Sequence, residues 1–420
     1  MERHTHMKTL MSAVVVLAVV AAGGEARASG IALDLQSARG VAMAGAVAGF
    51  IDDASGIYYN PAGIAQGQGI DVMLGITVIV PYFQNTAANG VQTNANSNLI
   101  TPPFIYATYG ISDEVTVGIG VFTPYGLSLS YPAGWPGRFI VTSVSDQEFD
   151  INPTVAFHFG PVRFAGGVQI VRSTVELQSN INLLTANPNV YTPPAPAADL
   201  GAATWGWGGN AGIQVDIIEK VLQIGATYRS RISFGYTGAV HFSNIPPAFQ
   251  GQLYDQPGNT NLVTPDSFSL GVGYKPISCL QLDADLLYFG WQVFQEIALN
   301  YPQTPSLNSV ELKSWHHTWQ FKVGVEWVID EHWALRGGLM YDPTPSPTST
   351  LQPDVPDSSR LNFAAGFGWR AGAFHVDVGA QWIYFFPTTS GEVSTSLPLY
   401  NPASYSANAL VGTVSFEIKI

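Results

Sequence analysis

The sequence is poor in charge, poorest in basic residues, and has one cysteine. Only 17 Lys and Arg and 30 Asp and Glu occur in 420 residues, so 11% of the chain is charged, whereas a soluble protein carries about 25%. Because Cys279 is the single cysteine, the sequence excludes an intramolecular disulfide framework, a Cys-rich zinc site and a Cys-ligated iron–sulfur cluster. The net charge of −13 argues against a nucleic-acid partner, because phosphate binding requires a basic face.

Long apolar runs are also missing, except at the N-terminus. Residues 1–28 combine basic Arg3 and Lys8, an apolar stretch over 9–24 and an Ala26-Arg27-Ala28 motif, which together are typical of a secretory signal peptide. We expect cleavage after Ala28; the alternative, a membrane-anchoring helix, would need about 20 apolar residues. After Ser29 no apolar run reaches about 18 residues, so the exported chain has no candidate transmembrane helix.

What the chain does contain is strict alternation of apolar and polar residues. Between Trp319 and Ile329 the odd positions are large and apolar, whereas most of the even positions are polar or glycine. A period of two indicates β-strands, and the same pattern recurs in about fourteen segments. We predict strands near 70–82, 103–111, 115–123, 147–159, 162–177, 204–217, 221–237, 265–275, 279–297, 312–329, 333–342, 359–370, 373–386 and 408–420.

The two faces of these strands favour an all-β transmembrane antiparallel barrel of about 14 strands over a soluble β-sandwich or soluble barrel. Aromatic residues such as Trp319, Trp333 and Trp382 lie near strand ends, as an interfacial girdle requires. The other face is small and polar but carries little charge, which suits a narrow lumen better than a solvated surface. An even strand number is the rule in bacterial outer-membrane barrels.

The connections between the predicted strands alternate between short and long. Short turns fall near 111–115, 159–162, 217–221, 275–279, 329–333 and 370–373, whereas 83–102, 178–203, 243–264, 298–311, 342–358 and 387–407 are long and polar. Outer-membrane barrels have short periplasmic turns and long outer loops. We therefore predict a signal peptide over 1–28, an N-terminal segment over 29–69 that is not strand-like, and a barrel over 70–420.

The N-terminal segment resembles the hatch of the FadL/TodX family of outer-membrane channels for long-chain fatty acids and hydrocarbons. Residues 38–46 and 52–63 carry this resemblance, and Asn60-Pro61-Ala62 matches the NPA motif of the family. Similar blocks follow in order at 123–126 with 135–139, at 264–268 with 288–291, and at 335–342 with 353–357 and Arg360. The resemblance covers essentially the whole exported chain.

The resemblance implies a lumen plugged by the hatch and a kinked third strand that opens the barrel wall sideways. The third predicted strand contains Gly118, Gly120, Pro124 and Gly126. Proline cannot donate to a strand ladder, and glycines in strands mark bulges or close approaches, so an interrupted wall is physically reasonable here. The alternative is that the glycines only fill a crowded lumen face.

A fatty-acid carboxylate would need a cation in the lumen. Alternation points Arg163, Arg229, Lys322 and Arg336 inward, and these four are the candidates. The alternative is that inward acids such as Glu326, Asp283, Asp285 or Asp377 neutralise them, since charges away from water need partners. In that case the ligand could be a neutral aromatic hydrocarbon.

We therefore expect a protein of the bacterial outer membrane that takes up hydrophobic compounds passively, with gating by the hatch and lateral exit at the third strand. Its partners would be a fatty acid or arene, outer-membrane lipids or detergents, and the barrel-assembly machinery; we expect a monomer, no cofactor and no metal. A general porin or adhesin is the alternative. A hydrolase built on His158, His375, Asp283 and Asp285 is remote, because no nucleophile motif accompanies them.

Overall fold

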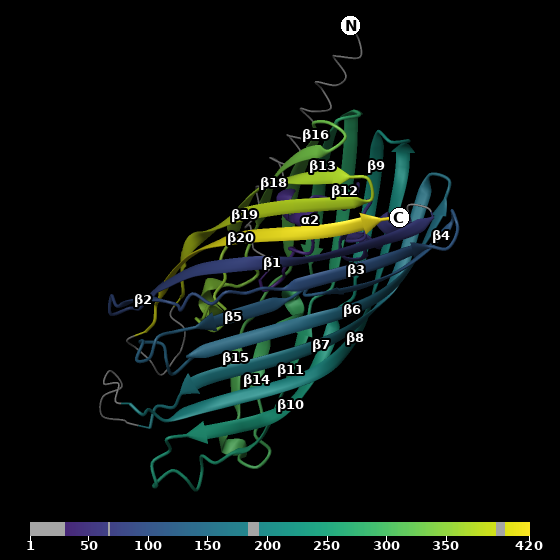
Figure 1. The fold of residues 1–420 in the computed structure, drawn as a ribbon. Helices are drawn as coiled ribbons and strands as arrows, with labels where there is room; N and C mark the ends of the chain where they lie inside the picture. Colours follow the sequence, from purple (N-terminus) through teal and green to yellow (C-terminus); the bar gives the residue numbers. More distant parts are fainter. Residues whose placement is uncertain (1–29, 66–67, 184–192, 392–399) are drawn as a thin grey trace.

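A computed structural model describes residues 30–65, 68–183, 193–391 and 400–420, so the predicted signal peptide lies outside the described residues. The chain forms a closed antiparallel barrel of fourteen strands, as predicted, in which the last strand pairs with the first from Asp71–Lys419 to Thr86–Ser404 (Figure 1). Three of the fourteen are each divided in two (β4 with β5, β9 with β10, and β11 with β12). The barrel strands are β1 (Gly69–Thr86), β3 (Pro103–Gly110), β4 (Val115–Phe122), β5 (Gly126–Ser130), β6 (Ser143–Phe159), β7 (Val162–Asn180), β8 (Ala197–Ile218), β9 (Leu222–Arg229), β10 (Ile232–Ser243), β11 (Gln256–Thr264), β12 (Ser267–Ile277), β13 (Leu280–Phe289), β16 (Thr318–Val328), β17 (Trp333–Asp342), β18 (Arg360–Ala371), β19 (Phe374–Thr389) and β20 (Ser404–Lys419).

The strand boundaries differ from the prediction mainly at the long-loop end. β8 begins at Ala197 and β11 occupies 256–264, where we predicted loops, whereas β13 already ends at Phe289. The segment after β13 forms a separate hairpin of β14 (Glu296–Leu299) and β15 (Ser309–Leu312), and β16 starts only at Thr318. These outer stretches carry no regular apolar face, so the period of two that reveals a lipid-facing strand is weak there.

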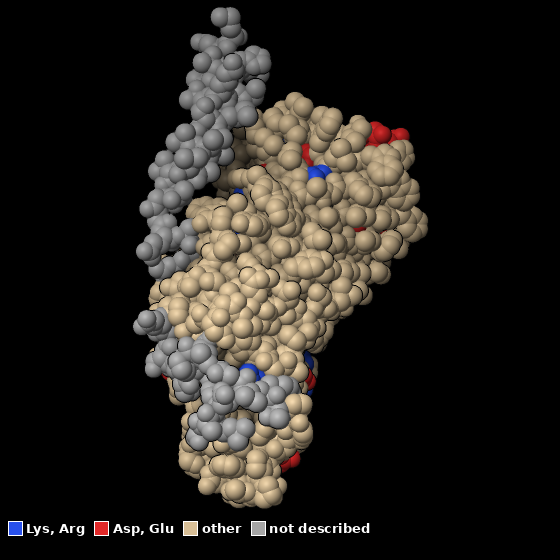
Figure 2. All heavy atoms as spheres, turned by 90° about the vertical axis from the view of Figure 1, so that its left-hand side faces the viewer, with Lys and Arg blue, Asp and Glu red and all other residues tan. Residues whose placement is uncertain are grey.

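The outer wall is an apolar surface. Trp205, Trp207, Trp327 and Phe374 expose about half or more of their side chains on it, as do many Leu, Ile and Val residues. The face seen in Figure 2 carries few charged atoms. Within the described residues no helix is both long and apolar enough to be a membrane-spanning helix.

The N-terminal segment folds inside the barrel, where α2 lies in Figure 1. It contains α2 (Ala38–Ala42), α3 (Gly56–Tyr59) and the 3₁₀ turn η2 (Pro61–Ile64), and almost every residue from 35 to 65 is buried. α2 packs against β17 to β20, whereas η2 packs against β6 to β8. We call residues 30–65 the hatch.

Glycines in the barrel wall make room for the hatch. A Cβ atom on Gly225 would lie 2.0 Å from the Ala48 carbonyl oxygen, and one on Gly338 would lie 2.4 Å from the Met43 carbonyl carbon. Real Cβ atoms do not approach other heavy atoms this closely, so these wall positions are restricted to glycine while the hatch is in place. The high glycine content of the strands therefore serves contact between wall and hatch.

The remaining elements cap the end of the barrel that carries the long loops. β2 (Gln92–Asn94) pairs with the end of β1. Three short 3₁₀ turns, η3 (Trp291–Val293), η4 (Pro305–Leu307) and η5 (Thr348–Thr350), lie in the long connections. The short turns and the C-terminus lie together at the opposite end (Figure 1).

Candidate functional site

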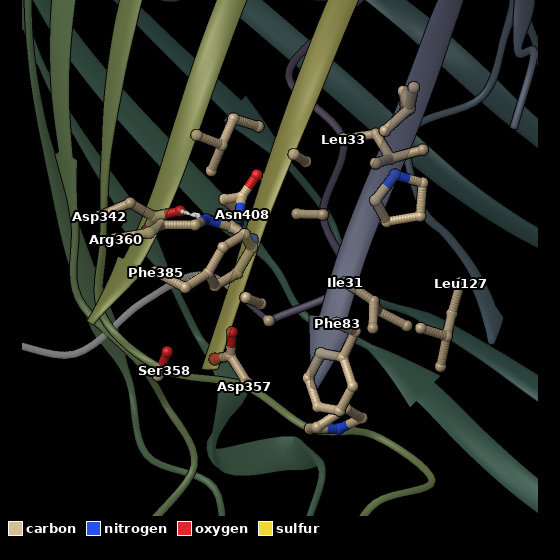
Figure 3. A pocket seen from close by; sticks show the side chains of 18 of the residues that line it. Ile31, Leu33, Phe83, Leu127, Asp342, Asp357, Ser358, Arg360, Phe385 and Asn408 are labelled. Carbon is tan, nitrogen blue, oxygen red and sulfur yellow. Dashed lines mark hydrogen bonds and ion pairs between the residues drawn. The ribbon is translucent and has the colours of Figure 1, made fainter. Parts of the chain in front are cut away.

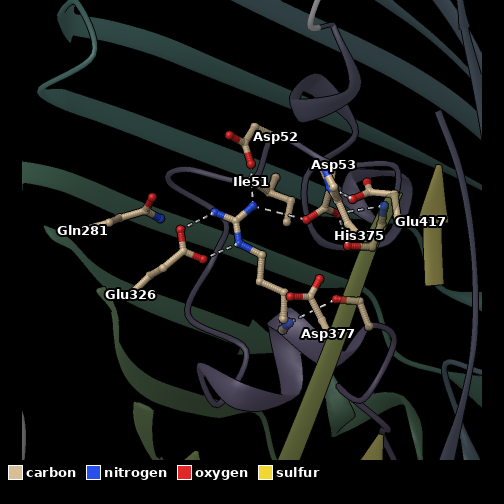
Figure 4. A network of polar contacts seen from close by, with 12 residues as sticks. Ile51, Asp52, Asp53, Gln281, Glu326, His375, Asp377 and Glu417 are labelled. Carbon is tan, nitrogen blue, oxygen red and sulfur yellow. Dashed lines mark hydrogen bonds and ion pairs between the residues drawn. The ribbon is translucent and has the colours of Figure 1, made fainter. Parts of the chain in front are cut away.

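A buried charge network holds the hatch to the wall. Arg39 on α2 contacts Glu326 of β16 through Nε and Oε2 at 3.1 Å, and its Nη1 atom reaches Asp53 Oδ2 at 3.2 Å and also Asp52 (Figure 4). Glu326 also accepts from Arg336 Nε at 2.6 Å, and Arg336 Nη1 reaches Asp377 at 2.5 Å. Two arginines and four carboxylates therefore link hatch, β16, β17 and β19.

The two hatch carboxyl groups in this network have different electrostatic surroundings. Burial would raise the pKa of Asp52, but Arg39 and Lys419 outweigh it and hold that pKa well below its usual range. Burial raises the pKa of Asp53, which Arg39 only partly offsets and which the nearby Glu417 raises further. Of the two hatch carboxyl groups, Asp52 is therefore the one whose ionised form its surroundings favour.

Asn60 of the NPA motif binds the hatch to a wall strand. Its Nδ2 atom donates to the Ala48 carbonyl at 2.9 Å and to the Ile213 carbonyl on β8 at 3.1 Å. Its Oδ1 atom accepts from the Ala62 backbone N–H at 3.2 Å and so caps η2, with Pro61 at the first position of the turn. The whole side chain is buried, so the motif has a structural role in positioning the hatch.

The third barrel strand is interrupted where Pro124 lies. β4 ends at Phe122 and β5 begins at Gly126, and β5 pairs with β6 only. The start of the hatch fills the break: Ala32 forms a β-bridge with Tyr125, Leu33 N donates to Pro124 O at 2.8 Å and Gly126 N donates to Ile31 O at 3.2 Å. The loop at 96–98 approaches the other edge of β5, where Asn96 N donates to Ser130 O at 2.9 Å.

Gly118 and Gly120 lie elsewhere in this strand. Both belong to β4, which pairs without interruption with β3 and β6 at these residues. A Cβ on Gly118 would lie 2.9 Å from Ile57 Cδ1 of the hatch, and one on Gly120 would lie 2.8 Å from the Tyr106 ring. Crowding at the lumen face accounts for these two glycines, whereas Pro124 and Gly126 flank the break.

Each of the four candidate lumen cations has an acidic partner within the chain. Arg163 Nη2 lies 3.0 Å from Asp216, and Arg229 Nη1 lies 3.5 Å from Asp150. Lys322 contacts Asp34 of the hatch, and Arg336 belongs to the network described above. Arg229 also donates to the carbonyl oxygens of Ile57 at 2.9 Å and Tyr58 at 3.1 Å, so it supports the hatch.

An apolar cavity of about 190 Å³, which we call the outer pocket, lies between the start of the hatch and the wall near the long loops (Figure 3). Ile31 and Leu33 line one side, and Phe83, Leu127 and Phe385 contribute apolar surface from the wall and the loops. Most of the surface that faces the cavity is apolar, although polar side chains such as Ser128, Gln320 and Asn408 also line it. Apolar residues also form the floor, namely Leu35, Ile79, Ile383 and Ala409.

One cation lines the outer pocket, and two carboxyl groups compensate it. Arg360 Nε and Nη2 both reach Asp342 Oδ2 at 2.8 Å, and the guanidinium lies over the Phe385 ring at 5.3 Å. Asp357 accepts from Thr344 Oγ1 at 2.6 Å. Burial raises the pKa of Asp357 from 3.8 to about 6, although Arg360 opposes this shift. Asp34 also lines the pocket and is paired with Lys322, so the three carboxyl groups of the lining outnumber by one the two cations that compensate them.

The sequence pattern missed the lining of the outer pocket and the partners of Arg39 and Lys322. Arg360 was present in the third family-like block, but no spacing in the sequence connects it to Asp342, Asp357 and Phe385. The isolated charge of Arg39 between Ala38 and Gly40, in a segment otherwise small and apolar, is the one local signal of a buried ion pair.

Comparison with known proteins gives a consistent result. The sequence model of the family described as outer membrane protein transport protein (OMPP1/FadL/TodX) matches residues 18–418. The long-chain fatty acid transport protein of Escherichia coli O6:H1 is 24% identical over 417 residues, covering 90% of this chain and 92% of the relative. Among solved structures, a FadL homologue of Pseudomonas aeruginosa superposes with a TM-score of 0.81 at 16% identity over 93% of this chain and 99% of the other. The toluene transporter TodX of Pseudomonas putida superposes with a TM-score of 0.69 at 16% identity over 92% and 99%.

Proposed function

Because this chain belongs to the outer membrane transport protein family that includes FadL and TodX, we propose that it is a passive channel for hydrophobic compounds, either long-chain fatty acids or aromatic hydrocarbons. The family is one of transporters and not of enzymes. Two of the residues that a hydrolase would have used have other contacts in the structure. His375 Nδ1 lies 2.9 Å from Glu417 Oε2, and Asp285 accepts hydrogen bonds from the backbone N–H groups of Val47 and Ala48 in the hatch at 2.8 Å each.

The outer pocket is the observation that carries this proposal. A hydrophobic solute gains about 25 cal/mol for each Å² of apolar surface removed from water, and a water-filled pore does not provide that gain. The pocket is largely apolar and lies at the long-loop end, where a solute from outside would enter. Its inner side is the start of the hatch, so a bound solute would touch the segment that fills the break in the third strand.

Lateral exit is the step we propose next. The break between β4 and β5 removes strand pairing on one side of β5. From within, the hatch closes it through the bridge between Ala32 and Tyr125 with two flanking hydrogen bonds, and through the Gln36 side chain, which hydrogen-bonds the Thr123 backbone. Displacing residues 31–33 breaks few contacts compared with opening a complete strand ladder. A solute in the outer pocket could then leave sideways into the lipid, and transfer would run downhill with consumption inside the cell.

The charges of the lumen favour a neutral solute over an anion. Arg163, Arg229, Lys322 and Arg336 each have an acidic partner, and Arg360 is held by Asp342. A fatty-acid carboxylate in the outer pocket would have to displace one of these partners or accept the proximity of Asp342 and Asp357. The general porin remains the second candidate, but a lumen occupied by the buried hatch supports it poorly.

Uptake by whole cells tests the proposed function. Cells that lack their own channels of this class would be supplied with this chain and given labelled toluene, labelled oleate and a labelled sugar of similar mass. We expect faster uptake of a hydrophobic tracer and unchanged uptake of the sugar. Faster sugar uptake alone would identify a porin. Native mass spectrometry of the purified protein would then identify a co-purifying ligand.

A further inference from the structure

A second apolar cavity shares Ile31, Leu127 and Val355 with the lining of the outer pocket, and we call it the acidic pocket. Its walls come from β5, β6, β7, β10 and β11 and from the segment after β13. Leu127, Val175, Leu262 and Phe294 provide a long apolar surface. Four carboxyl groups also line it, whereas its lining residues include no Lys, Arg or His in the part of the chain that the structure describes.

Two of these four carboxyl groups need no external partner. Asp354 accepts from Lys313 Nζ at 2.6 Å, and Glu176 is exposed. The other two, Asp146 and Glu148, are two positions apart on β6. Alternate residues of a strand point to the same side, so both lie on the inward face. The next inward carboxyl group, Asp150, is paired with Arg229, so among these three acids of β6 a cation compensates Asp150 but not Asp146 or Glu148.

Glu148 is the unusual member of this set. Its side chain is buried, with 1% of the residue exposed, and its Oε2 atom has no hydrogen-bond partner among the described residues. It also lines the adjoining cavity beside Tyr125, so it stands where the two cavities meet. Asp146 has only the Ser173 hydroxyl, at 3.4 Å.

Further unpartnered polar atoms lie in the same cavity. Thr260 and Trp291 both line the acidic pocket, and the buried atoms Thr260 Oγ1 and Trp291 Nε1 have no hydrogen-bond partner in the part of the chain that the structure describes. A buried carboxylate without a partner is costly, since neither water nor a cation compensates its charge. An ammonium group carries three donors and no acceptor, which suits a cavity lined by a carboxylate oxygen and a hydroxyl oxygen that both lack a donor within the described chain.

We propose that the acidic pocket binds amphiphiles that combine an apolar chain with a protonated amine, with the amine at Glu148. The chain would lie along Leu127, Val175, Leu262 and Phe294. A fatty-acid anion is disfavoured here, because its carboxylate would lie beside two carboxyl groups and find no cation among the lining residues that the structure describes. This inference rests on the proposed function, and it extends the range of hydrophobic solutes to cationic ones.

Displacement of a neutral fluorescent probe tests the proposal. Purified full-length protein in detergent would be loaded with diphenylhexatriene and titrated with decylamine, decanol and decanoate near neutral pH, where the amine is charged and the acid is ionised. Each ligand partitions into the micelles equally for every protein variant. The ratio of its displacing concentrations for wild type and variant therefore reports on binding to the pocket alone. The variants are Glu148→Gln, which is isosteric, and Glu219→Gln in an exposed turn as the matched control.

We expect decylamine to displace the probe at lower concentration than decanol or decanoate in the wild type. Glu148→Gln should raise the concentration of decylamine needed to displace the probe by at least about tenfold, since a charged hydrogen bond is lost. The concentration of decanol needed should stay unchanged. Glu219→Gln should behave as the wild type. If Glu148→Gln does not assemble, Asp146→Asn should show the same selective loss.

The outcomes separate this proposal from the proposed function. If the neutral probe does not bind the wild type at all, the proposed function fails. If the probe binds but decylamine shows no advantage over decanol, or if Glu148→Gln and Asp146→Asn leave that advantage intact, the amine site is wrong while hydrophobic transport stands.

Discussion

Arg39 Nε and Glu326 Oε2 lie 3.1 Å apart, although 287 residues separate them in the chain. This pair joins a five-residue helix of the hatch to β16, close to the short turn that follows this strand. Both side chains are almost fully buried, so the contact is shielded from solvent. It is one of the contacts that make hatch and barrel a single folded unit.

Removal of the Arg39 charge should loosen the hatch. Arg39→Gln removes the guanidinium that Asp52, Asp53 and Glu326 share, and breaking a buried ion pair costs about 3 kcal/mol or more. Arg336 still compensates Glu326, so we expect the barrel to assemble. Conductance in planar bilayers should rise, and thermal unfolding should occur at a lower temperature. The exposed Lys220→Gln provides the control; equal conductance of the two variants would contradict a holding role for Arg39.

A side chain at Gly225 should push the hatch out of place. In Gly225→Val the new Cβ would lie 2.0 Å from the Ala48 carbonyl oxygen, and overpacking of this kind costs about 1–3 kcal/mol. We expect increased influx of a small polar dye with unchanged heat-modifiable migration of the barrel. Gly412→Val adds the same side chain where nothing lies within 4 Å, so it should leave influx unchanged. If dye influx through Gly225→Val equals that of the wild type, the hatch adapts to the added side chain.

A disulfide across the break in the third strand should stop transport if exit is lateral. Ala32 and Tyr125 form the bridge, and the flanking hydrogen bonds mark them as a non-hydrogen-bonded antiparallel pair. Such pairs have Cα atoms about 4.5 Å apart, which suits a disulfide. The double variant Ala32→Cys with Tyr125→Cys would be prepared with Cys279→Ser, because Cys279 is a free thiol.

We expect the oxidised form to lose uptake of a hydrophobic tracer and to recover it on reduction. The two single-cysteine variants serve as controls for the loss of the Tyr125 ring and of Ala32. Full uptake with a completely formed disulfide would show that the solute leaves by another route, for example along the barrel axis.

Binding of anions to the outer pocket should depend on pH through Asp357. Burial raises the pKa of this carboxyl group from 3.8 to about 6. The folded protein therefore holds a proton there between these values that the unfolded chain releases, so the stability contributed by this group is present at low pH and falls as the pH rises toward 6. Protonation also removes one negative charge from the pocket.

The measurement compares decanesulfonate, which stays charged, with decanol by displacement of a neutral probe. We expect sulfonate affinity relative to decanol to rise several-fold as the pH falls through about 6. Asp357→Asn should remove most of this dependence and give the low-pH affinity throughout. An unchanged pH profile in Asp357→Asn would assign the effect to another group.

The sequence predicted the barrel well and its interior poorly. The fourteen strands were identified because a lipid-facing residue must be apolar at every second position, as between Trp319 and Val328. The outer ends of the strands were misplaced because that requirement ends at the membrane surface. Two of the four acids named as neutralising partners, Glu326 and Asp377, do pair with Arg336. Lys322 and Arg163 instead pair with Asp34 and Asp216, which the sequence did not indicate.

By itself, the sequence determined the wall, the asymmetry of turns and loops, and the presence of a hatch-like segment, because these depend on local alternation and on contiguous motifs. Only the tertiary structure decided which side chains meet in the lumen. Strand register and closure of β1 on β20 bring Arg39 to Glu326, Ala32 to Tyr125 and Arg360 to Asp342. The tertiary structure also left Glu148 Oε2 without a partner among the described residues. Every strand that faces a buried charge helps to decide whether that charge is compensated.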